Sequence, residues 1–386
     1  MRVYSSIIVV CKNNIQKKIS KVVKKYARFE RINIESLYDI AYKFYYNDQF
    51  REKLRINYLG SIQFVSYQVK ADIVLITNEK LSINSIHLNL YNLENANILN
   101  TNTIDNHVFF VKNFYNYITH SKESNKYFKN ELWLITLKNS LHTNKQRKFT
   151  FNISTYHYSS ICINKVNNFV WEKYALIIWK LLYLHIDGVD TQEITNKLEK
   201  RMWSSTAFFR NFMQPGSIVS ISIPFPKDIY NSNLKWFVPE KSEEFTDNEL
   251  PKKYDYLPEY PPLRYLGLLT LEFSGFNEEI LRYSYEKLLH IQNQNILFRI
   301  LNSIRYLDKI DNLNYKVFSL EYIRPPIIRD FVTKCIDNKM QKMVQSNLTH
   351  LKASILNYII LSFTIIAIVL SIASNSKLVE FIEKLF

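Results

Sequence analysis

Glycine is scarce in this chain, and its five residues lie far apart, at Gly60, Gly188, Gly216, Gly267 and Gly275. The motifs GxxxxGK[ST] and GxGxxG need closely spaced glycines, because the backbone must approach the phosphates of the ligand. A P-loop and the usual dinucleotide-binding fingerprint are therefore excluded. The GxSxG, HExxH and EF-hand patterns are also absent from the sequence.

Cysteine is scarce as well, with Cys11, Cys162 and Cys335 far apart and in no CxxC or Cys/His ligand spacing. A disulfide scaffold and a structural zinc site both need denser patterns. We therefore expect a reducing compartment. The sequence gives no catalytic, cofactor-binding or metal-ligating residue, so whether the protein is an enzyme stays open.

A signal peptide is not recognisable at the N-terminus. The opening residues MRVYSSIIVVCKNN contain a short apolar stretch, but a basic helical pattern follows it instead of a small-residue cleavage site. We interpret residues 3–11 as a buried strand.

Long apolar runs are confined to one place, residues 355–373, with the sequence ILNYIILSFTIIAIVLSIA. About 20 apolar residues at roughly 1.5 Å each span the ~30 Å hydrocarbon core of a bilayer. The run has no charge, glycine or proline, and Lys352 and Lys377 flank it. A buried core helix is the alternative, but such helices are usually shorter and amphipathic. The run therefore predicts a transmembrane helix and a membrane localisation.

The charges around this run predict its orientation. Lys339, Lys342 and Lys352 precede it closely, whereas Lys377 and Lys384 after it are offset by nearby glutamates. Lys and Arg are concentrated on the cytoplasmic side of membrane spans. The chain is therefore expected to be single-pass and tail-anchored, with its N-terminal bulk in the cytoplasm.

The fold class expected is α+β, in the form of a cytoplasmic mixed α/β part of one or two domains, a stalk helix and a single C-terminal transmembrane helix. Apolar periodicity and the clustering of prolines set the boundaries. The predicted parts are an N-terminal α+β region at 1–168, a helical and strand region at 169–323 with a proline-rich acidic loop at 224–262, a juxtamembrane stalk helix at 324–352, a transmembrane helix at 353–374 and a short amphipathic tail at 375–386.

Local patterns predict the individual elements. Strands are expected at 3–11, 62–76, 85–93, 107–111, 131–137, 148–166, 217–223 and 264–273. Helices are expected at 13–28, 34–54, 168–186, 191–213 and 277–307, and the stalk is expected to run into the span without a break.

The predicted helix at 13–28 has a cationic face, and the chain as a whole carries a formal charge of +15. Such a face could meet anionic lipid headgroups or, less favourably in an anchored protein, a nucleic-acid backbone. A solvated amphipathic helix is the third alternative. The residues of this face are Lys17, Lys18, Lys21, Lys24, Lys25 and Arg28.

Three polar side chains in the span, Asn357, Thr364 and Ser371, follow one another at seven-residue spacing and share a helix face. Several copies could hydrogen-bond through this face. Ser and Thr can equally bond to the preceding turn of their own helix.

Together these features favour a membrane-anchored cytoplasmic sensor or effector. It would bind a partner or small ligand and act at the bilayer by oligomerising or by perturbing it. The order of parts resembles that of bacterial anti-phage effectors, and this resemblance implies a defence role. The alternatives are a membrane-tethered enzyme with an unrecognised site and a structural subunit of a larger membrane complex. The expected partners are the lipid bilayer and further protein subunits.

Overall fold

The structure is a computed structural model of the full chain. It describes residues 2–12, 21, 38, 41–43, 45–64, 69–81, 83–92, 101–120, 128, 132–142, 154–163, 170–184, 191–205, 209–223, 261–336, 338–374, 380 and 383–384. The predicted acidic loop up to residue 260, and the predicted helix 13–28 apart from Lys21, lie outside these residues.

The chain divides into two compact units. Unit 1 comprises Met1–Glu279 and Leu320–Ile336, and unit 2 comprises Ile280–Ser319 and Asp337–Phe386. One long helix, α9 (Pro261–Gln292), contributes residues to both units.

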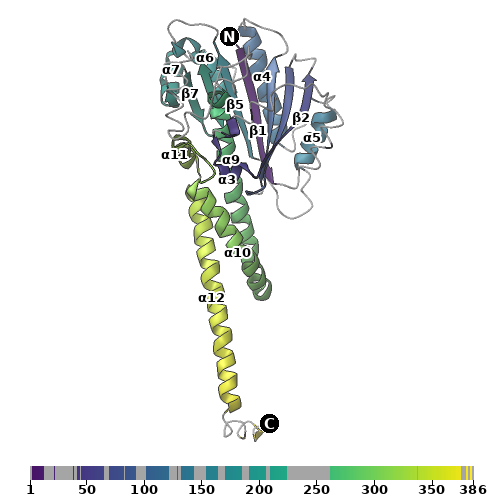
Figure 1. The fold of residues 1–386 in the computed structure, drawn as a ribbon, viewed down its shortest axis with the longest axis vertical. Helices are drawn as coiled ribbons and strands as arrows, with labels where there is room; N and C mark the ends of the chain where they lie inside the picture. Colours follow the sequence, from purple (N-terminus) through teal and green to yellow (C-terminus); the bar gives the residue numbers. More distant parts are fainter. Residues whose placement is uncertain are drawn as a thin grey trace. The chain divides into compact units, whose positions relative to one another are not determined.

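Unit 1 is built on an eight-stranded sheet, with β1 and β5 near its middle (Figure 1). The strand order is β2-β3-β4-β1-β5-β8-β7-β6, and neighbouring strands are antiparallel except for the parallel pair β5–β8. The strands are β1 (Arg2–Lys12), β2 (Leu54–Phe64), β3 (Val69–Asn78), β4 (Ile83–Asn92), β5 (Ser154–Cys162), β6 (Met202–Ser205), β7 (Phe209–Gln214) and β8 (Ser217–Ser222).

The middle of the sheet is covered on both faces. Ile7, Ile8, Val9 and Val10 of β1 are all 0% exposed, although successive side chains of a strand point to opposite faces. A strand buried on both faces has an uninterrupted apolar sequence, as residues 7–11 of β1 have. β5 alternates polar and apolar residues, a pattern typical of a half-exposed strand, but it is buried in the same way as β1.

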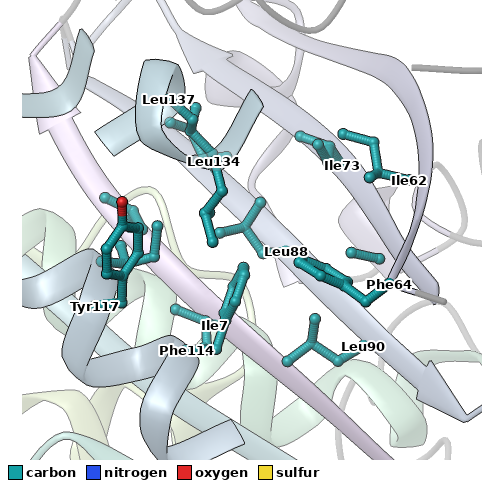
Figure 2. Packing of buried hydrophobic residues seen from close by; sticks show 14 of the residues in the cluster. Ile7, Ile62, Phe64, Ile73, Leu88, Leu90, Phe114, Tyr117, Leu134 and Leu137 are labelled. Carbon is teal, nitrogen blue, oxygen red and sulfur yellow. The ribbon is translucent and has the colours of Figure 1, made fainter. Parts of the chain in front are cut away.

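One face of the sheet carries α4 (Thr101–Thr119), α5 (Leu132–His142), α6 (Ala175–Tyr183) and α7 (Thr191–Glu199). Figure 2 shows Ile7 and Leu88 of the sheet lying among side chains of α4 and α5. Phe64 packs edge-on against Phe110 and Phe114 of α4, with ring centroids 5.1 and 5.7 Å apart. Edge-to-face aromatic pairs stabilise a core beyond the area that they bury.

The other face is covered by the first part of α9, which approaches the sheet through two glycines. A Cβ added at Gly267 would lie 2.6 Å from Cε2 of Tyr158. A Cβ added at Gly275 would lie 2.7 Å from atoms of both Tyr156 and Val10. Helix α9 therefore lies closer to the strands than any larger residue at these two positions would permit.

Several predicted elements are corrected by the structure. Residues 107–111 were predicted as a strand but lie in helix α4, the described part of the predicted strand 131–137 lies in α5, and 264–273 lies in α9. An apolar window of at most ten residues does not distinguish a strand from a buried helix by its periodicity alone. The predicted helix 191–213 is instead α7 followed by the hairpin β6–β7.

The predicted strands at 3–11, 85–93 and 217–223 are confirmed as β1, β4 and β8. The predicted run 62–76 is divided between β2 and β3. The coarser fold prediction is also confirmed: a mixed region of sheet and helices is followed by further helices and one long apolar C-terminal helix.

The described part of unit 2 is helical. After α9 come α10 (Ile296–Ser319) and the 37-residue α12 (Asn338–Ser374). Helix α11 (Pro326–Cys335) belongs to unit 1, where Phe331 packs on Trp203 with ring centroids 4.2 Å apart. Ile336 after α11 is extended, so the expected uninterrupted helix from 324 into the span is wrong.

We predict that Gly267→Ala and Gly275→Ala each lower the thermal unfolding temperature of the full chain in mild detergent. Overpacking a tight core costs about 1–3 kcal/mol, which exceeds the ~1 kcal/mol that alanine gains over glycine in a helix. Combining Gly267→Ala with Tyr158→Leu should recover part of the loss, because the ring nearest to the added methyl is removed. Unchanged stability of both single variants would contradict this packing.

Candidate functional site: an apolar helix and a buried polar cluster

Helix α12 presents an apolar surface that the rest of the protein does not cover. It is the one described helix that is long and apolar enough to cross a membrane, over Asn338–Ile372, and only 6% of its most apolar window is buried. A core helix of a soluble protein would be mostly buried. Side chains that are each more than half exposed include Leu356, Ile360, Leu361, Phe363, Ile366 and Leu370.

The three polar residues predicted to share a face of the span lie on α12, and all are exposed. Thr364 Oγ1 donates to the carbonyl of Ile360 at 2.9 Å, one turn earlier in the same helix. The carbonyl of Ser371 accepts a hydrogen bond from Ser374 Oγ at 3.0 Å. Thr364 is thus satisfied within its own helix, and assembly through Asn357, Thr364 and Ser371 stays a prediction.

The first part of α12 packs on α10 within unit 2. Val344, Leu348 and Leu351 of α12 are buried and recur at helical spacing, as do the buried Leu307, Ile310, Leu313 and Val317 of α10. Lys352 Nζ lies 2.5 Å from Asp311 Oδ2 of α10. The helix therefore has a protein-facing part up to Lys352 and an uncovered part after it.

The predicted cationic face is described at one position. Lys21 is helical and exposed. Lys17, Lys18, Lys24, Lys25 and Arg28 lie outside the described residues. A lipid or nucleic-acid contact by this face stays a prediction.

A cluster of buried polar groups lies between the sheet and α9, around the fully buried carboxylate of Glu272. Tyr42 Oη donates to Oε2 of Glu272, and Ser85 Oγ donates to Oε1 at 3.0 Å. Tyr46 Oη lies 3.4 Å from Oε1, and His87 Nε2 lies 3.4 Å from Oε2. We call these five residues the Glu272 cluster.

Two tyrosines of this cluster, Tyr42 and Tyr46, stack with Tyr38. The three are four residues apart, and the backbone N–H of Tyr46 donates to the carbonyl of Tyr42 at 3.0 Å, as in a helical turn. The ring centroids of Tyr38 and Tyr42 are 6.0 Å apart, and those of Tyr42 and Tyr46 are 5.1 Å apart with an interplanar angle of 10°. The stack places two hydroxyl groups at the carboxylate.

Both hydroxyl groups stay protonated. Burial raises the pKa of Tyr42 well above its ordinary value, and the charge of Glu272 raises it further. Burial and Glu272 also raise the pKa of Tyr46 well above its ordinary value. The two phenols therefore act as permanent donors to the buried carboxylate.

The Glu272 cluster is closed to solvent, since Tyr42, Tyr46, Ser85, His87 and Glu272 are each at most 1% exposed. A buried carboxylate that lost its donors would be strongly unfavourable. The cluster therefore acts as a polar link that holds α9 and the tyrosine segment onto β4.

A second buried polar group lies on the opposite face of the sheet, under α4. Ser5 Oγ is 2.9 Å from His107 Nε2 and 2.7 Å from Ser159 Oγ. His157 Nε2 is 2.9 Å from Ser159 Oγ, and its Nδ1 is 3.2 Å from Ser217 Oγ. We call this the serine–histidine row, and it ties β1, β5 and β8 to α4.

The two histidines of this row are neutral at pH 7. Burial lowers the pKa of His107 to about 4. Burial, with a contribution from His107, lowers the pKa of His157 to about 3. A neutral imidazole both donates and accepts hydrogen bonds, which suits its place between serine hydroxyls.

The sequence did not point to the Glu272 cluster. Ser85 and His87 alternate with apolar residues in β4, a pattern that also fits a solvent-facing strand. Glu272 lay inside a stretch predicted as a strand. The one usable signal was the four-residue spacing of Tyr38, Tyr42 and Tyr46, which marks a helix face.

Among the described residues, no group of three or more His, Cys, Asp or Glu side chains is placed to hold a metal ion. All three cysteines are free. In comparisons with known proteins, no family model, no curated protein and no solved structure matches the chain.

We predict that Tyr42→Phe destabilises the full chain more than Tyr46→Phe does. Both rings are buried in the same stack, but only Tyr42 makes a short bond to the carboxylate. Loss of that donor should cost about 1–3 kcal/mol, against less than about 1 kcal/mol for Tyr46. Thermal unfolding in mild detergent measures the difference, and equal losses would contradict the assignment of donors.

We also predict an acid-sensitive fold. The folded-state pKa values of His107 and His157 lie below the ordinary value of 6.5, so the unfolded chain binds more protons between these values. Their contribution to stability is complete above about pH 6.5 and is lost as the pH falls toward 4 and then 3, at up to about 1.4 kcal/mol per pH unit for each histidine.

Unfolding of unit 1 followed between pH 7 and pH 5 tests this dependence. The double variant His107→Asn/His157→Gln should show a shallower decline in stability than the unmodified chain, whatever its stability at pH 7. Parallel pH profiles for the two proteins would show that these histidines do not titrate on unfolding.

Proposed function

We propose that this chain is a single-pass membrane protein that acts at the bilayer as a sensor or effector. Unit 1 lies on the cytoplasmic side and binds a partner or small ligand, and α12 anchors the chain and acts by oligomerising or by perturbing the bilayer. The observation that carries the proposal is the uncovered apolar surface of α12.

The size of that surface supports a lipid environment. Apolar surface costs about 25 cal/mol per Å² while it stays in water. Monomeric soluble proteins rarely expose such a continuous apolar stretch. Lipid removes the cost, and a helix suits lipid because its backbone groups are bonded to one another.

The hydroxyl groups within the apolar stretch are also compatible with lipid. Ser362 Oγ donates to the carbonyl of Tyr358 at 2.8 Å, and Thr364 donates to that of Ile360. Neither group needs water or a second helix as a hydrogen-bond partner.

The charges on α12 support the proposed orientation. Lys339, Lys342 and Lys352 are exposed in the turns before the apolar stretch. Arg324, which also precedes it, is bonded to Asp48 within unit 1 at 2.7 Å. The lysines of α12 are therefore the charges that we expect to hold this end of the helix on the cytoplasmic side.

The proposal places no catalysis at the Glu272 cluster, because its polar groups hydrogen-bond to one another inside the fold. Oligomerisation and a setting in anti-phage defence are parts of the proposal that rest on the order of the chain's parts alone.

We predict that Ile366→Arg releases the full chain from the membrane fraction after alkaline extraction. An arginine near the middle of a span costs about 2.5–3.5 kcal/mol on insertion scales. Met343→Arg is the matched control, since Met343 is exposed on the same helix before the apolar stretch, and this variant should stay in the membrane. Release of neither variant, or of both, would count against α12 as the anchor.

The effector activity has its own test. Induced expression of the full chain in bacteria should lower the membrane potential and slow growth, and Ile366→Arg should remove both effects at equal protein level. Growth inhibition that persists in this variant would assign the effect to unit 1. No effect from the anchored chain would contradict the bilayer-perturbing role.

A further inference from the structure

The start of α10 has an exposed apolar surface that is separate from that of α12. Its exposed side chains Ile296, Leu297, Phe298, Leu301 and Ile304 are 54%, 67%, 55%, 56% and 66% exposed. We call these five residues the α10 apolar end. From Arg305 onward the exposed positions of α10 become mostly polar, with Arg305, Asp308, Lys309 and Asn312.

Helix α12 changes character in the same way. Its exposed residues up to Lys352 are mostly polar, and those that follow Ile355 are mostly apolar. Two helices of unit 2 thus each have a polar exposed part and an apolar exposed part.

The ion pair between Asp311 and Lys352 joins the two helices. Arg305 is six residues from Asp311, or ~9 Å along α10, and Ile355 is three residues from Lys352, or ~4.5 Å along α12. The α9–α10 turn and the C-terminal end of α12 point the same way (Figure 1). The two changes from polar to apolar surface therefore lie on the same side of this ion pair, each within about 10 Å of it along its own helix.

We propose that the α10 apolar end lies in the interfacial layer of the leaflet that α12 enters, so that unit 2 meets the bilayer through two helices. The inference rests on the proposed membrane span of α12. Lipid is the occupant that this geometry favours, because the α10 apolar end lies on the same side of the Asp311–Lys352 ion pair as the apolar surface of α12.

The polar groups around the apolar end fit the headgroup layer. The turn Gln292–Asn295 carries amides and no charge, and Asn302 Nδ2 donates to Gln294 Oε1 at 2.7 Å. Arg299 donates to the carbonyl of Gln294 at 3.1 Å, and Lys287 Nζ lies 3.9 Å from the ring centre of Tyr306. Cations and amides beside exposed apolar side chains are typical of segments that lie in the interface without crossing it.

Spin labels on single cysteines test the depth of the α10 apolar end. The full chain with Cys11→Ala, Cys162→Ser and Cys335→Ser is reconstituted in vesicles of phosphatidylethanolamine and phosphatidylglycerol. A label then replaces Phe298, Tyr315 or Phe363, one position at a time. Oxygen concentrates in the hydrocarbon and a nickel chelate is excluded from it, so their collision rates with the label report its depth.

The label at 298 should show an oxygen-to-nickel collision ratio several-fold higher than the label at 315, which lies on the polar part of the same helix. The label at 363 should show the highest ratio. A label at 298 that behaves like the one at 315, while 363 lies in lipid, would overturn the interfacial proposal and leave the span intact. A water-exposed label at 363 would overturn the span and the present inference together.

Contact with a second copy is a distinct outcome. It would appear as spin–spin broadening at 298 together with low accessibility to both reagents, and it would overturn the lipid assignment.

The unmodified chain provides a second measurement, in case the cysteine-free variant does not fold. Photoactivatable phospholipids should then crosslink to peptides covering residues 296–304, and absence of that crosslink beside a strong one in 355–373 would also overturn the proposal.

Discussion

The exposed apolar surface of α12 is unfavourable in water, and this constraint underlies the interpretation of the whole chain. Only 6% of its most apolar window is buried by protein, so the protein itself does not remove the cost of hydrating these side chains. The proposed bilayer would remove this cost. The start of α10 has the same constraint on a smaller scale, because five of its apolar side chains are each more than half exposed.

Unit 1 differs from α12, since it encloses polar side chains in its interior. Glu272 takes hydrogen bonds from Tyr42 and Ser85, and the serine–histidine row is paired across β1, β5, β8 and α4. Satisfied buried polar groups specify one arrangement, because any alternative packing would leave some of them without partners. The two clusters thus determine how the helices on each face fit the sheet.

Parts of this architecture could be predicted from sequence where the pattern was long and unambiguous. The uninterrupted apolar run of β1 and the charge-free stretch of α12 are examples. The strand predictions for 107–111 and 264–273 were wrong because these stretches of α4 and α9 are largely buried, which hides the helical period in a short window. Glu272 could not be placed, since its partners come from β4 and the tyrosine segment, and no local spacing reveals contacts between residues so far apart in the chain.

The parallel pairing of β5 with β8 has a consequence for how the sheet can be dissected. Ser217–Ser222 follows β5 by a long crossover that contains α6, α7 and the strands β6 and β7, and it lies between β5 and β7 in the sheet. In a fragment that ends before Ser217, β5 would be an exposed edge strand, and its backbone could pair with other chains. Self-association and proteolytic sensitivity of such fragments would then reflect the missing neighbour and not a defect in the strands that remain.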